Sequence, residues 1–182
     1  MKRYMAIALV LIFMIMAATN VLAQQSASAA SQNSNPFIGE LKQMYIGVKN
    51  NLSKMAEKMP EEHYKFKATE DVRTFGQLIG HVADSQARAC SAANGEQKSV
   101  DAASKTTKAD LIAALKESFA ICDKAFDSLT DAKAGQMIQV GQRQRSLLGI
   151  LTGTISHSNE EYGYMAVYMR LKGVVPPSSE RR

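Results

Sequence analysis

Two histidines and one glutamate are the residues whose types and spacing point to metal chemistry in this chain. His157 and Glu161 lie four positions apart, and residues at that spacing stack on one face of an α-helix. His81 would complete the set from a neighbouring helix. Two imidazoles and one carboxylate, with the remaining positions left to water, form an open site that suits a catalytic divalent metal.

The elements that must position these side chains are helices predicted from apolar residues at helical spacing. Thr74 and Thr107 suit the N-cap positions of two of them. The stretch from Ala132 to Arg145 contains two glycines and is expected to be a loop, with a short extended turn as the alternative and no persistent strand signal. Helices are expected over residues 36–59, 75–93, 107–129 and 146–171. This pattern predicts an all-α protein, a single four-helix bundle.

Helical phase separates Glu161 from its neighbour Glu160. At about 100° per residue, His157 and Glu161 lie on one shoulder of the core stripe of the last helix. Glu160 points to the outer face, and His81 flanks the stripe of the second helix. Side chains that flank the apolar stripes of two packed helices can meet, so these helical positions permit a metal site between the two helices.

Spacing alone leaves simpler interpretations open, because a lone histidine or an i, i+4 His/Glu pair often only stabilises a helix. Asp84, one turn from His81, either orients a metal ligand from behind or is solvated or paired with Arg88. His63 has no partner at helical spacing and is expected at the surface. Arg170 is either a substrate clamp or a favourable cation near a helix end.

The N-terminal region predicts export. Lys2 and Arg3 precede an apolar run, and Ala23 closes a small-residue cleavage site. A membrane anchor is the alternative, but the run is shorter than the roughly 20 residues that span a bilayer. We expect a secreted or periplasmic protein without stable membrane insertion after cleavage. The expected organisation is signal peptide 1–23, low-complexity linker 24–35, bundle domain 36–178 and C-terminal tail 179–182.

Charge and composition restrict the partners. The formal net charge is +5, and the basic residues are dispersed rather than interleaved with aromatic ones, which argues against nucleic-acid binding. A small-molecule substrate is the partner class that agrees with a metal site. The composition demands no oligomer, although it allows a homodimer.

The two cysteines, Cys90 and Cys122, are predicted to form a disulfide because the protein is expected in an oxidising compartment. The bridge would close a loop of about 32 residues and stabilise the fold by up to about 3.7 kcal/mol in the chain-entropy estimate. Two free buried thiols or two thiolate metal ligands are the alternatives. Cys90 lies more than two helical turns past His81, which disfavours a shared metal site.

Three stretches carry a family likeness: residues 58–67 (KMPEEHYKFK), 72–84 (VRTFGQLIGHVAD) and 161–178 (EYGYMAVYMRLKGVVPPS). Through them, the chain from about residue 41 to residue 178 resembles the DinB-like (DinB/YfiT-like) family of four-helix metalloproteins. Members of that family typically hold a metal with one histidine of the second helix and a His-x3-His pair of the fourth. His81 and His157 match the first two positions, and Glu161 stands where the third histidine is expected.

The resemblance implies a divalent-metal enzyme, a hydrolase or a thiol-dependent transferase, with no catalytic residue assigned beyond the ligands. The carboxylate shifts the preference toward iron(II) or manganese while still allowing zinc, and nickel is not distinguished from these. The same substitution is also compatible with a lost metal site. The alternative function is therefore a non-catalytic, stress-related or ligand-binding bundle with a degenerate site.

Overall fold

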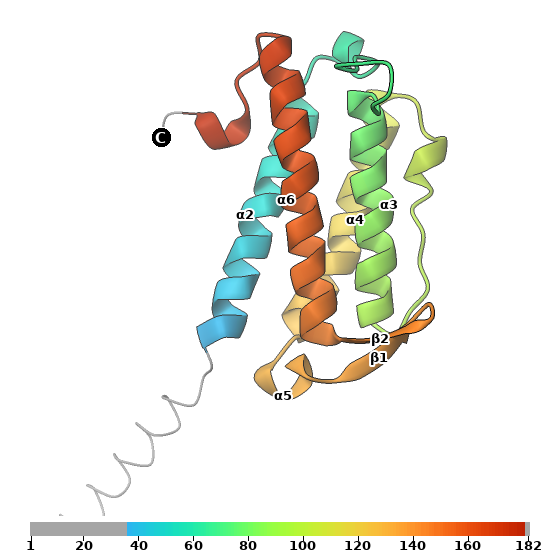
Figure 1. Cartoon of the computed structure of the whole chain (residues 1–182), viewed down its shortest axis with the longest axis vertical. Helices are drawn as coiled ribbons and strands as arrows, with labels where there is room; N and C mark the ends of the chain where they lie inside the picture. Colours follow the sequence, from blue (N-terminus) through green and yellow to red (C-terminus); the bar gives the residue numbers. More distant parts are fainter. Residues whose placement is uncertain (1–35, 181–182) are drawn as a thin grey trace, which may run out of the picture. The chain divides into compact units, whose positions relative to one another are not determined.

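Four long helices form the protein in the computed structural model, which describes residues 36–180. The predicted signal peptide and linker lie outside the described residues. Helices α2 and α6 run in one direction along the bundle, and α3 and α4 run in the other (Figure 1). Their bounds are α2 Pro36–Lys58, α3 Phe75–Ala93, α4 Lys108–Ser128 and α6 Leu147–Leu171. The all-α bundle predicted from apolar spacing is confirmed.

Local capping explains why three of these helices begin where the sequence predicts. The Thr74 hydroxyl accepts from the backbone N–H of Gln77, whose side chain accepts from the N–H of Thr74, which makes a capping box. Thr107 and Ser146 cap α4 and α6 in the simpler way, through the side-chain oxygen alone. These caps satisfy N–H groups that a helix leaves unpaired, so each start is defined locally.

The end of α6 is defined by Gly173, which has a φ of 71°. That left-handed conformation suits glycine and commonly ends a helix. Beyond it, the short 3-10 helix η3 (Pro177–Ser179) returns to the bundle. The Tyr162 hydroxyl donates to Ser178 Oγ, and the amine of Lys58 lies 2.5 Å from Glu180. The described part of the predicted tail is therefore attached to the bundle.

The segment predicted to be a loop between α4 and α6 is more ordered than expected. It contains the short helix α5 (Asp131–Ala134) and an antiparallel hairpin of β1 (Met137–Val140) and β2 (Arg143–Ser146). Gly141 has a φ of 59° at the first of the two turn positions, as a type II′ turn requires. The interpretation as a plain loop was therefore wrong, and the short extended turn that was its alternative is this hairpin. Strands this short and polar show little apolar alternation, so no persistent strand signal was visible.

Residues from all four long helices fill a continuous apolar core. The rings of Tyr45 and Phe126 stack with centroids 3.9 Å apart and join α2 to α4. Each fully buried large apolar side chain stabilises the fold by about 1.5–3 kcal/mol. These side chains include Leu52, Met55, Met59, Phe75, Ile79, Leu115, Leu151, Met165 and Met169. The core gives α3 and α6 a firm relative position, which the candidate site requires.

The predicted disulfide is present. Cys90 of α3 and Cys122 of α4 are bonded, with their Cα atoms 4.9 Å apart, within the usual range for a disulfide. Because the two sulfurs are bonded to each other, the interpretations as free thiols and as metal ligands are wrong. Within residues 36–180, no helix combines the length and the apolarity that crossing a membrane requires.

Candidate metal centre

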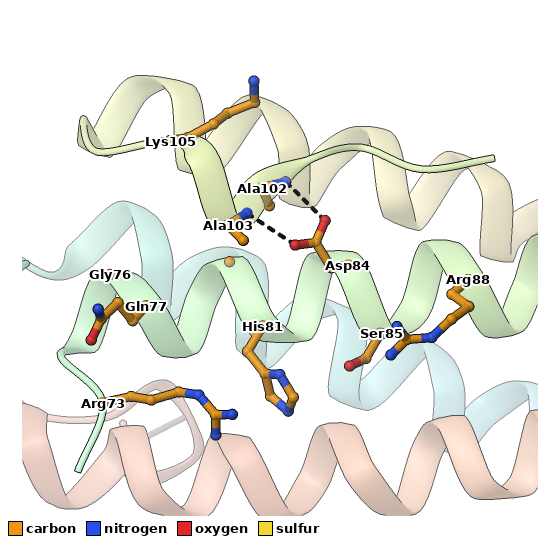
Figure 2. A pocket seen from close by; sticks show the side chains of 11 residues that line it. Arg73, Gly76, Gln77, His81, Asp84, Ser85, Arg88, Ala102, Ala103 and Lys105 are labelled. Atoms are coloured by element: carbon orange, nitrogen blue, oxygen red, sulfur yellow. Dashed lines mark hydrogen bonds between the residues drawn. The ribbon is translucent and has the colours of Figure 1, made fainter. Parts of the chain in front are cut away.

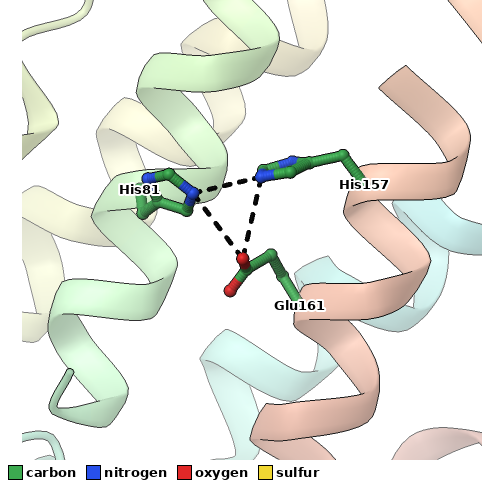
Figure 3. A group of neighbouring side chains, drawn as sticks. All are labelled: His81, His157 and Glu161. Atoms are coloured by element: carbon green, nitrogen blue, oxygen red, sulfur yellow. Dashed lines mark hydrogen bonds and ion pairs between the residues drawn. The ribbon is translucent and has the colours of Figure 1, made fainter. Parts of the chain in front are cut away.

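The three predicted ligands meet between α3 and α6. His81 projects from α3, and His157 and Glu161 project toward it from successive turns of α6 (Figure 3). The Nε2 atoms of His81 and His157 are 3.1 Å apart. Glu161 Oε1 lies 3.6 Å from His81 Nε2 and 3.7 Å from His157 Nε2. The tertiary structure therefore brings together three side chains whose proximity the sequence allowed but did not establish.

The size of this triangle suits a metal ion. The three atoms lie on a circle with a radius of about 2.0 Å, and zinc binds imidazole nitrogen and carboxylate oxygen at about 2.0–2.2 Å. An ion near the centre of the triangle would therefore touch all three ligands without any movement of the helices. Facial binding by three residues leaves the other coordination positions for water or substrate.

The Glu161 carboxylate is the part of the cluster that most needs a cation. Its side chain is only 8% exposed, and Oε2 has no hydrogen-bond partner among the described residues. A buried carboxylate with an unpartnered oxygen is energetically costly, and a cation bound at Oε1 would offset its charge. Glu160, by contrast, is exposed and accepts a hydrogen bond from Tyr164. Helical phase thus selected the carboxylate that turns inward.

The surroundings of His81 favour its neutral form. Burial lowers the pKa of His81, and the positive charges of Arg73, His157 and Arg88 lower it further, against the opposing effect of Glu161. The lowered pKa of His81 therefore favours its uncharged form. A divalent ion binds the neutral form of imidazole. His81 and His157 are 29% and 33% exposed, so one side of the cluster is open.

Asp84 has a different role from any that the sequence suggested. Its two carboxylate oxygens accept hydrogen bonds from the backbone N–H groups of Ala102 and Ala103, at 2.8 and 2.9 Å (Figure 2). Neither orientation of a ligand nor pairing with Arg88 is observed. Asp84 instead attaches the 3-10 helix η2 (Ala102–Ser104) to α3. The interaction is non-local, so local spacing could not reveal it.

Gly80 belongs to the same attachment. A Cβ atom at this position would lie 3.1 Å from the carbonyl oxygen of Ala102, a tight contact. The Gly80-His81-Val82-Ala83-Asp84 motif therefore uses one face of α3 to hold η2 and another to present His81.

Sequence reasoning missed a buried polar network next to the cluster. Gln86 Nε2 of α3 donates to Ser158 Oγ of α6 at 3.0 Å, and Ser118 of α4 donates to Gln86 Oε1 at 3.4 Å. All three side chains are buried. Ser158 follows His157 directly, so the network helps to hold α3 and α6 in the register that aligns the ligands. A glutamine on the apolar face of α3 was the available signal.

The remaining candidate residues lie outside the cluster. His63 is half-buried in the 3-10 helix η1 (Glu61–His63) and is not part of the group of ligand atoms. The Arg170 guanidinium donates to the Ala166 carbonyl and to Ser179 Oγ. It therefore joins the end of α6 to the following segment, as the helix-end interpretation predicts.

Three cavities adjoin the cluster. One of about 390 Å³ lies beside His81 and is lined by Arg73 and Arg88 (Figure 2). A second of about 680 Å³ borders Glu161 and is mainly apolar. A third of about 390 Å³ reaches both His81 and His157. The candidate ligands are therefore accessible to small molecules from more than one side.

The fold and the site together place the protein in the class of four-helix bundles with a candidate metal site between two helices. Residues 45–165 match the model of the DinB superfamily. This chain belongs to that superfamily, which confirms the resemblance seen in its motifs.

Solved structures agree on the fold. A DinB-like protein from Bacillus subtilis superposes with a TM-score of 0.63 at 19% identity, covering 79% of this chain and 99% of its own. A DinB-like protein from Bacillus cereus superposes with a TM-score of 0.64 at 18% identity, covering 75% of this chain and 93% of its own. No curated protein matches the chain. At these identities the structural likeness establishes the fold alone.

Proposed function

We propose that this chain is a metal-dependent enzyme that binds one divalent ion through His81, His157 and Glu161. The observation that carries the proposal is the unpartnered, buried Oε2 of Glu161. The other oxygen of that carboxylate, Oε1, and the Nε2 atoms of His81 and His157 lie on a circle whose radius matches the length of a metal–ligand bond. An abandoned site would have no reason to retain a buried carboxylate in that position.

The chain's own residues define what the centre would do. When bound, the ion supplies a Lewis acid that lowers the pKa of a water or a thiol. Glu161 offsets one of its positive charges, and the two half-exposed histidines leave a face open to substrate. This arrangement supports hydrolysis or thiol-dependent transfer. An exported protein meets little cytoplasmic thiol, which favours hydrolysis.

The mature protein is proposed to act outside the cytoplasm, with residues 1–23 as a cleaved signal peptide and 24–35 as a linker. The Cys90–Cys122 disulfide supports this location, because such bonds persist in oxidising compartments. Expression of the full chain in a secreting host, followed by mass spectrometry, should give a mature protein that begins at Gln24. A cytoplasmic protein of full length would contradict export.

Elemental analysis of the purified protein tests the metal site. We expect about one equivalent of a divalent transition metal, lost in His157→Ala and in Glu161→Ala. Glu160→Ala is the matched control, since Glu160 is the adjacent, exposed carboxylate of the same helix and should leave the metal content unchanged. Metal-free protein whose melting temperature does not respond to added zinc, iron(II), manganese or nickel would instead favour the non-catalytic bundle.

A further inference from the structure

Two arginines lie on either side of His81. Arg73 precedes α3 and Arg88 lies two turns beyond His81 on α3, and both side chains extend toward α6 (Figure 2). Both line the cavity of about 390 Å³ that His81 borders. We refer to Arg73 and Arg88 as the arginine pair.

The arginine pair has no anionic partner among the residues that the structure describes. Within residues 36–180, neither guanidinium makes an ion pair or a hydrogen bond with another residue. The one carboxylate on the same cavity, Asp84, uses both oxygens to hold the backbone of η2. Lys105 also lines the cavity, and its amine points away from the arginine pair (Figure 2). The space beside the candidate metal is therefore positively charged, because both arginines are exposed and no carboxylate of the described residues pairs with either.

An apolar cavity adjoins the arginine pair. Arg73 also lines the cavity of about 680 Å³ that borders Glu161, together with Val72, Leu78, Val167 and the exposed Asp71. The Tyr168 hydroxyl donates to the backbone carbonyl of Arg73 at 3.0 Å and fixes its main chain against α6. Positive charge and apolar surface thus meet at Arg73, next to two of the three candidate ligands.

We propose that the substrate is an organic anion: a carboxylate or phosphate ester whose charged group binds the arginine pair and whose apolar part occupies the cavity at Val72, Leu78 and Val167. Guanidinium groups match both anions through paired N–H donors. The anion would lie beside His81 and the apolar part beside Glu161, which places the intervening bond at the metal face. This inference rests on the proposed function, since it names the substrate class of the same centre.

The test uses the purified, metal-loaded protein with benzoate and phenyl phosphate as probes and neutral benzamide as their control. Binding is measured by calorimetric titration. We expect both anions to bind at least about tenfold more tightly than benzamide, and Arg73→Gln and Arg88→Gln each to weaken them about tenfold. Arg143→Gln, an exposed arginine of β2 that lines none of the three cavities, should leave both affinities unchanged.

The outcomes separate the claims. Which of the two anions binds more tightly identifies the charged group, and weaker binding of acetate and inorganic phosphate confirms the apolar contact. Unchanged affinity in both arginine variants, with their metal content intact, overturns the inference and leaves the metal site standing, because the anions would then bind the metal alone. Absence of metal from the unmodified protein overturns the proposed function. The loss of anion affinity in the arginine variants is a separate measurement that does not depend on the metal content.

Discussion

Replacement of Glu161 by glutamine should move the stability of the metal-free and metal-loaded protein in opposite directions. In the metal-free protein, Oε2 of this buried carboxylate has no partner among the described residues. Leaving a buried acceptor unsatisfied costs about 1–3 kcal/mol. Glutamine keeps the shape and still leaves an unpaired amide there, but it removes the buried charge, whose desolvation costs more than that of a neutral group. The metal-free variant should therefore be more stable by about 1–3 kcal/mol, or roughly 3–10 °C in melting temperature for a domain of this size.

The metal reverses the comparison. A ligand that binds only the folded state at 1,000 times its Kd stabilises that state by about 4.1 kcal/mol. The unmodified protein should gain this amount, and the variant, having lost one of three ligands, should gain almost none. Glu161→Gln should therefore melt above the unmodified protein after chelation and below it in excess metal.

Thermal unfolding followed by circular dichroism, with chelator and then with zinc or manganese, measures both shifts. Glu160→Gln is the control and should stay within about 0.5 kcal/mol of the unmodified protein in either condition. If Glu161→Gln is the less stable protein after chelation, the buried carboxylate is satisfied without metal. The reasoning from its unpartnered oxygen would then be refuted.

Three further outcomes are expected. Replacing Cys90 and Cys122 together by alanine should lower the free energy of unfolding by up to about 3.7 kcal/mol, measured by urea denaturation, because a loop of 32 residues is no longer closed. Asp84→Asn should destabilise the protein by about 1–3 kcal/mol and speed hydrogen exchange at the η2 amides, whereas unchanged exchange would contradict its role in holding that turn. Burial and Arg73 lower the pKa of His81, so at low pH the unfolded chain binds a proton more readily than the folded chain. The metal-free protein should therefore lose stability as the pH falls through 6.5, the ordinary pKa of histidine. Urea titrations at several pH values should show this dependence, and His81→Ala should flatten it.

Local signals account for most of the fold that could be predicted. Apolar spacing and the caps at Thr74, Thr107 and Ser146 define the helix bounds within about one residue, because both act over a single turn. The hairpin at Gly141 was expected only as an alternative, a short extended turn, because its strands are short and polar, although the turn residue itself was visible. The η2 turn was missed because it depends on Asp84, about eighteen residues earlier in the chain.

The candidate site divides in the same way. The sequence by itself determined that His157 and Glu161 share one face of a helix, since the period of the helix relates them. Only the tertiary structure decided that His81 reaches them, because the packing of α3 on α6 and the buried Gln86–Ser158 hydrogen bond set the register between the two helices.

The surroundings of the cluster belong entirely to the tertiary structure. Dispersed basic residues gave no sign in the sequence that Arg73 and Arg88 lie on either side of His81. Whether a charge is neutralised depends on neighbours that the fold brings close, and Coulomb interactions act through space rather than along the chain. The sequence thus determined the residues that can bind a metal, and the fold decided that they meet beside a positively charged space and an apolar cavity.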